Sequence, residues 1–127
     1  MVHLKRCIVE VRAEEKCLAH SLTIAIARLN NNANYKDYRQ GRKKHPAVEQ
    51  LLVTTGIDLK KGDGPSELTK YQQHFHVYMI AVYAELNCES IMFQGHLYSY
   101  KGINLLKDEV SQHYLIITNL LKAMAKQ

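Results

Sequence analysis

The sequence predicts an α+β fold in which N-terminal helices pack on a C-terminal antiparallel sheet of about four strands. Three observations lead to this prediction. Apolar residues recur at helical spacing in the first half of the chain, the pattern changes to a dense β-type run after His76, and short polar turns separate the runs that follow. Helices first and strands last are typical of an α+β domain.

Size and composition indicate one domain covering residues 1–127. The chain has 127 residues, of which 46% are hydrophobic and 23% charged, an ordinary balance for a protein with one core. No apolar run approaches the roughly 20 residues that cross a bilayer, and Met1 to Arg12 lacks the long apolar stretch of a signal peptide. We therefore expect no membrane association.

The first strong element is a helix that starts at about Cys17. Before it, Val2 to Val11 predicts a weak strand or extended arm, followed by a polar loop. The helix has apolar residues on one face, and three consecutive Asn residues at 30–32 favour a turn that ends it. These apolar residues are Leu18, Leu22, Ala25, Ile26 and Leu29.

Two further helices begin at proline, which suits the first turn of a helix. Pro46 opens one that Gly56 ends, and Pro65 opens another that runs through Phe75. The polar, basic stretch Ala33 to His45 predicts a loop with a helical turn around Tyr35 to Tyr38.

Four β-type runs fill most of the second half. A turn at Lys107–Glu109 separates the last two, and Asn119 to Gln127 predicts a short terminal helix. The predicted strands are Val77–Tyr83, Ser90–Phe93, Ile103–Leu106 and His113–Thr118.

The cysteines and the charge limit the cellular setting. Cys7, Cys17 and Cys88 form no CxxC pair, which argues against a disulfide framework and a structural zinc site. We therefore expect a reducing compartment, the cytoplasm or the nucleus, and no cofactor or metal. The net charge of +5 is mildly basic and is compatible with nucleic acid or an acidic partner without specifying either.

Cys17 is the candidate nucleophile. It lies where a polar loop meets the N-terminus of an apolar helix, and the helix dipole and free N–H groups there stabilise a thiolate. His113 is the candidate base, because it begins a late strand that can pack beside the helix. The alternatives are a small buried hydrophobe for Cys17 and a surface histidine for His113.

Two segments resemble motifs of ovarian-tumour (OTU) cysteine peptidases. Cys17 to Leu22 resembles the nucleophile motif, and His113 to Ile117 resembles the histidine motif. More narrowly, Cys17–Leu29, Gly64–Phe75 and His113–Lys126 resemble the domain that precedes type B, protein-primed DNA polymerases of Maverick/Polinton transposons and related viruses.

The resemblance implies a papain-like, OTU-like thiol hydrolase that cleaves ubiquitin or ubiquitin-like isopeptide conjugates. Its third catalytic residue is commonly Asn or Asp two positions after the histidine, where this chain has Leu115, a residue that accepts no side-chain hydrogen bond. Glu14, three residues before Cys17, is the substitute we favour, with a solvated surface acid as its alternative; Asn119 ranks lower.

Two other functions remain open. Leu115 motivates a catalytically weak or inactive module that only binds ubiquitin, and the charge and the polymerase context motivate a nucleic-acid accessory domain. Other features favour simpler interpretations, namely a solvated loop for Arg39–Lys44 and ordinary histidines rather than a metal site for His74, His76 and His96.

Overall fold

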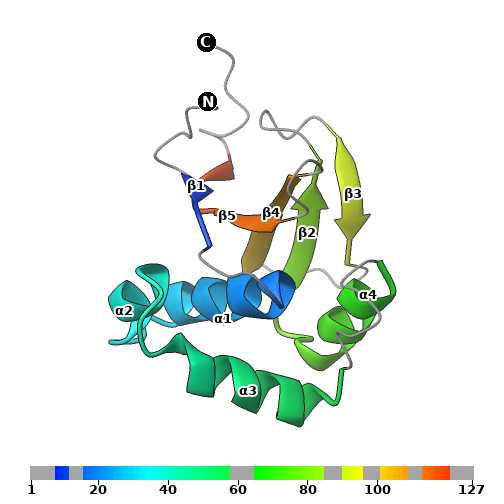
Figure 1. Ribbon diagram of the computed structural model, residues 1–127. Coiled ribbons are helices and arrows are strands. Elements are labelled where there is room, and N and C mark those ends of the chain that lie inside the picture. Colours follow the sequence, from blue (N-terminus) through cyan, green and yellow to red (C-terminus); the bar gives the residue numbers. More distant parts are fainter. Residues whose placement is uncertain are drawn as a thin grey trace.

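The computed structural model describes residues 8–11, 16–57, 65–84, 90–95, 101–108 and 113–120. In these residues the chain forms an α+β fold of four helices and a mixed five-stranded sheet (Figure 1). The elements in chain order are β1 (Ile8–Val9), α1 (Cys17–Leu29), α2 (Tyr35–Arg39), α3 (Lys44–Thr55), α4 (Pro65–His74), β2 (Met79–Tyr83), β3 (Ile91–Gln94), β4 (Gly102–Asp108) and β5 (His113–Ile117).

The prediction of a helix from Cys17 to the asparagines is confirmed. Asn31 has a φ of 52°, and the N–H of Asn32 bonds to the carbonyl of Ala27 at 2.9 Å. This is the left-handed ending that asparagine tolerates better than most residues. The helix is buried on nearly every side, because most of its side chains are apolar or small.

The other predicted helices are also confirmed, with small shifts of their ends. The helical turn near Tyr35 is α2, and α3 starts two residues before Pro46. Gly56 ends α3 in the left-handed region with a φ of 66°, and its N–H bonds to the carbonyl of Leu52 at 2.9 Å. The expected terminal helix, apart from Asn119 and Leu120, and the expected link at 60–64 lie outside the described residues.

The prediction of an all-antiparallel sheet is wrong at one pairing. The strand order is β1-β5-β4-β2-β3, and β2 pairs with β4 in parallel, from Met79 beside Gly102 to Tyr83 beside Leu106. The remaining neighbours are antiparallel, and β1 adds a fifth strand beyond β5.

Burial explains why the strands do not follow each other as a meander. β3 exposes most of its side chains, Ile91 and Met92 among them, so it suits the edge of the sheet. β4 buries Ile103, Leu105 and Leu106 on two faces, so it suits the interior. β4 therefore lies between β2 and β5, and it extends to Asp108 through residues that the sequence predicted as a turn.

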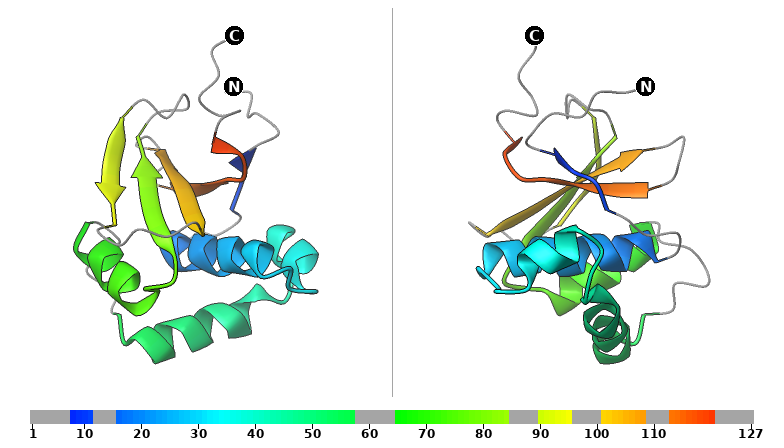
Figure 2. Two further views of the ribbon diagram at one scale, coloured as in Figure 1. Left: turned by 180° about the vertical axis from the view of Figure 1, so that it is seen from behind. Right: turned by 60° about the vertical axis from the view of Figure 1, so that its left-hand side comes forward.

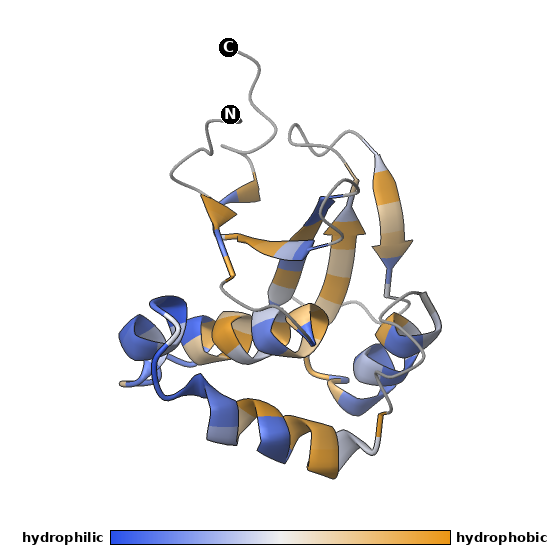
Figure 3. Ribbon diagram, viewed as in Figure 1, coloured by the Kyte–Doolittle hydropathy of each residue, from blue (hydrophilic) through white to orange (hydrophobic). Residues whose placement is uncertain are grey.

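The sheet has two apolar faces. One packs on the helices, with α1 between the sheet and α3, as the two views of Figure 2 show. The other carries a smaller cluster of Ile8, Ala81, Tyr83, Leu106, Leu115 and Ile117. Figure 3 shows the hydropathy along the ribbon, with a largely hydrophobic β2 and a hydrophilic α2.

A buried amide fastens α4 to the start of β2. Gln72 is 5% exposed; its Oε1 accepts from the N–H of Ile80 at 2.8 Å, and its Nε2 donates to the carbonyl of Tyr78 at 2.7 Å. Gly95 packs against this side chain so closely that a Cβ there would overlap it. One glutamine thus satisfies two buried backbone groups where the chain changes from helix to strand.

Candidate active site

Cys17 lies at the first position of α1 and is buried against the backbone of β5. Its side chain is 5% exposed. The Sγ accepts a hydrogen bond from the N–H of Tyr114 at 3.1 Å and lies 3.6 Å from the carbonyl oxygen of the same residue, to which it can donate. The thiol is thus held beside the residue that directly follows His113.

The sheet leaves room for the helix at this point. β1 pairs with β5 only at Ile116 and Ile117, so the edge of β5 at Tyr114 faces the start of α1 instead. Ser21, one turn after Cys17, donates its hydroxyl to the carbonyl of Tyr114 at 3.1 Å. Cys17 and Ser21 therefore join α1 to β5 at Tyr114. At Ile116 and Ile117, β1 bonds to the same edge of β5 instead.

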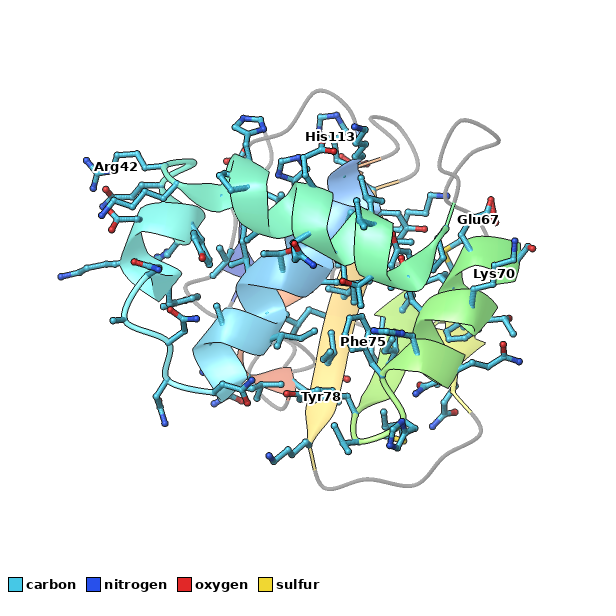
Figure 4. The ribbon with its side chains drawn as sticks, turned by 90° about the horizontal axis from the view of Figure 1, so that it is seen from below. Arg42, Glu67, Lys70, Phe75, Tyr78 and His113 are labelled. Carbon is cyan, nitrogen blue, oxygen red and sulfur yellow. The ribbon has the colours of Figure 1, made fainter. Side chains whose placement is uncertain are left out.

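His113 begins β5 and lies at the end of the molecule where α1 starts (Figure 4). The Tyr114 nitrogen is about 2.4 Å from the Cα of His113 in standard geometry, so adding the 3.1 Å bond places Sγ within about 5.5 Å of that Cα. The structure therefore brings the thiol of Cys17 close to the backbone of His113, 96 positions further along the chain.

The electrostatic surroundings favour a thiolate. The N-terminus of α1 carries the positive end of the helix dipole, and Lys16 at its N-cap provides no side-chain cap. Two lysines, Lys16 and Lys44, also lie near His20, one turn from Cys17 on the same side of the helix. Glu49, which pairs with Lys16 at 3.2 Å, opposes part of their charge.

The buried side chain of His20 is affected by the same positive charges. Its imidazole is 4% exposed, and its Nδ1 has no hydrogen-bond partner in the part of the chain that the structure describes. Burial, and after it the nearby positive charge of Lys44, lowers the pKa of His20 from 6.5 to about 4. The ring is therefore neutral at pH 7, packed edge-to-face on His45 with ring centroids 5.6 Å apart.

We expect His20 to make the fold sensitive to acid. Its pKa is lower in the folded state than in the unfolded chain, so the unfolded chain binds more protons between pH 6.5 and 4. The free energy of unfolding should therefore fall as pH falls through this window, by at most about 3 kcal/mol. Urea unfolding of the native protein and of His20→Phe, which keeps an aromatic ring but does not titrate, measures the difference; an unchanged pH slope in His20→Phe would contradict the assignment.

The residues predicted to orient the His113 imidazole do not lie together near Cys17 in the described part of the chain. Glu14 lies outside the described residues. Leu115 is 9% exposed and belongs to the apolar cluster on the face of the sheet away from α1. Asn119 follows the end of β5, beyond the strand that carries His113. Ser21 was not singled out from the sequence, although its position four residues after Cys17 places it on the same helical face.

The basic stretch at 39–44 contains ion pairs of its own. Arg42 and Lys43 each pair with Asp37, at 3.3 Å, so part of the basic stretch is neutralised. His96, Cys7 and Cys88 lie outside the described residues. Across the described segments, no group of three or more His, Cys, Asp or Glu side chains is placed to hold a metal ion, and no helix is long and apolar enough to span a bilayer.

The chain was compared with protein-family models, with curated proteins and with solved structures, and none of them matches it.

Proposed function

We propose that this domain is an OTU-like cysteine peptidase that hydrolyses isopeptide bonds of ubiquitin or a ubiquitin-like protein. Cys17 is the nucleophile and His113 its base. One observation carries the proposal: the Sγ of Cys17, at the start of a buried helix, bonds to the backbone of the residue next to His113. A thiol at a helix start with a histidine in reach is the arrangement that thiol hydrolysis needs.

The reaction follows from these two groups. His113 takes the thiol proton, and the Sγ attacks the carbonyl carbon of the isopeptide bond. Backbone N–H groups in the first turn of α1 are suited to stabilise the oxyanion. His113 then returns the proton to the departing lysine amine, which leaves a thioester, and a water activated by His113 hydrolyses that thioester to a carboxylate and the free thiol.

The burial of Cys17 restricts the substrate. Because Cys17 is 5% exposed, we propose that the substrate approaches the thiol with a thin extended segment rather than with a folded surface. This favours the C-terminal segment of a modifier protein as the acyl donor. We propose that the reaction takes place in a reducing compartment, the cytoplasm or the nucleus, and the lack of a CxxC pair among the three cysteines supports this.

Cleavage of isopeptide-linked conjugates tests the proposal. The native protein should release modifier from at least one member of a panel of ubiquitin and ubiquitin-like conjugates, and Cys17→Ala should release none. Cys17→Ala removes a small buried group, so the thermal unfolding midpoint is measured beside activity. A panel that stays intact with the native protein would contradict the proposal.

A non-catalytic binding module is the second candidate. The burial of Leu115 favours it, because the position two residues after His113 offers no group to orient the imidazole. This candidate predicts that the native protein and Cys17→Ser bind a modifier with equal affinity and that neither releases it. Such binding would replace the peptidase proposal.

A further inference from the structure

Asp108 lies directly opposite His113 in the sheet. β4 ends at Asp108, β5 begins at His113, and the antiparallel register pairs their Cα atoms. Side chains of directly opposed residues project from the same face, with Cβ atoms about 4.5–5.5 Å apart. The sequence predicted a turn here, which concealed the pairing.

The alternation of side chains confirms the shared face. Leu106 and Leu115, two residues from Asp108 and His113 along their strands, both belong to the apolar cluster on the face away from α1. Between them, Lys107 and Tyr114 project the other way, with the Lys107 ammonium 5.4 Å from the centre of the Tyr114 ring. Asp108 and His113 thus continue one column of cross-strand pairs to the end of the sheet.

The strand order places His113 between a thiol and a carboxylate. The N–H and the carbonyl of Tyr114 point sideways from β5 toward Cys17, on the side where β1 lies further along. β4 and Asp108 lie on the opposite side of β5. Across this end of the sheet the three residues therefore lie in the order Cys17, His113 and Asp108.

We infer that Asp108 is the positioning residue of His113, in the role that Leu115 is unable to fill. One ring N–H of His113 donates a hydrogen bond to the Asp108 carboxylate, and the other ring nitrogen is left to accept the proton of Cys17. The carboxylate fixes the tautomer and stabilises the imidazolium that forms during attack. This inference rests on the proposed peptidase function for its catalytic consequence, whereas the register that sets Asp108 opposite His113 belongs to the sheet itself.

The test combines a rate with a spectroscopic measurement on Asp108→Asn, which keeps the shape and removes the charge. Turnover of an isopeptide-linked conjugate should fall by about 10- to 10⁴-fold, because the amide favours the wrong tautomer. The ¹⁵N shifts of the His113 ring should show a changed tautomer ratio in the resting variant. Asp108→Glu keeps the carboxylate, so it should retain part of the turnover and part of the native tautomer ratio. Asp37→Asn, which removes a carboxylate from α2, should change neither the turnover nor the tautomer ratio.

The outcomes separate the two proposals. A native protein that cleaves conjugates, with an Asp108→Asn variant unchanged in both rate and tautomer, overturns the role of Asp108 and leaves the peptidase intact. A changed tautomer in a native protein that cleaves nothing supports the pairing and contradicts the peptidase. Loss of turnover in Glu14→Gln, with Asp108→Asn unchanged, assigns the role to Glu14 and also overturns the inference.

Discussion

Replacing His113 by Ala is expected to lower the turnover of an isopeptide-linked modifier conjugate by about 10²- to 10⁴-fold, the usual contribution of a general acid–base group. The Cys17 thiol bonds to the backbone of Tyr114, so the helix and strand remain attached when the imidazole is removed. The loss should therefore fall on the chemical step, with little change in binding. Initial rates over a range of substrate concentrations separate kcat from KM and measure this effect.

The matched control is His76→Ala, an exposed histidine in the turn between α4 and β2. It should retain the native rate. If His113→Ala also retained the native rate, with Cys17→Ala inactive, another group would be the base and the assignment of His113 would be wrong.

Replacing Gln72 by Leu is expected to lower the free energy of unfolding by about 2–5 kcal/mol. The substitution keeps an apolar side chain of similar size but removes the partners of the Ile80 N–H and the Tyr78 carbonyl. Each buried group left without a partner costs about 1–3 kcal/mol. Because Gln72 fastens α4 to the central strand β2, the loss should appear as one cooperative shift in urea unfolding.

Gln73→Leu is the matched control, since Gln73 is the exposed neighbour on the same helix. It should change the free energy of unfolding by less than about 0.5 kcal/mol. Gly95→Ala should also destabilise the protein, because its methyl group would occupy the place of the Gln72 side chain. Equal stability of the Gln72→Leu and Gln73→Leu variants would show that the buried amide is dispensable.

Local signals in the sequence predicted the helices well. Proline near the first turn, Asn31 and Gly56 in left-handed endings, and apolar spacing along α1 each act within a few residues of the boundary they set. The order of strands depends instead on which strand buries both faces. β4 enters the sheet between β2 and β5 for that reason, and hydrophobic runs of similar length do not reveal the choice.

The two candidate site residues were predicted mainly from the resemblance of their segments to OTU motifs, helped by the position of Cys17 at a helix start. Cys17 begins a helix and His113 begins a strand, and the structure places the thiol beside the backbone of that strand. The role that we infer for Asp108 was not predicted, because it depends on the register between β4 and β5. Glu14 stays a prediction, since it lies outside the described residues.

The most direct test of the account is the site at which a ubiquitin or ubiquitin-like propargyl-amide probe attaches to the native protein. Mass spectrometry of the digested adduct identifies the modified residue. We expect one covalent adduct, on Cys17, absent from Cys17→Ala. An adduct on Cys7 or Cys88, or no adduct with any modifier, would contradict it.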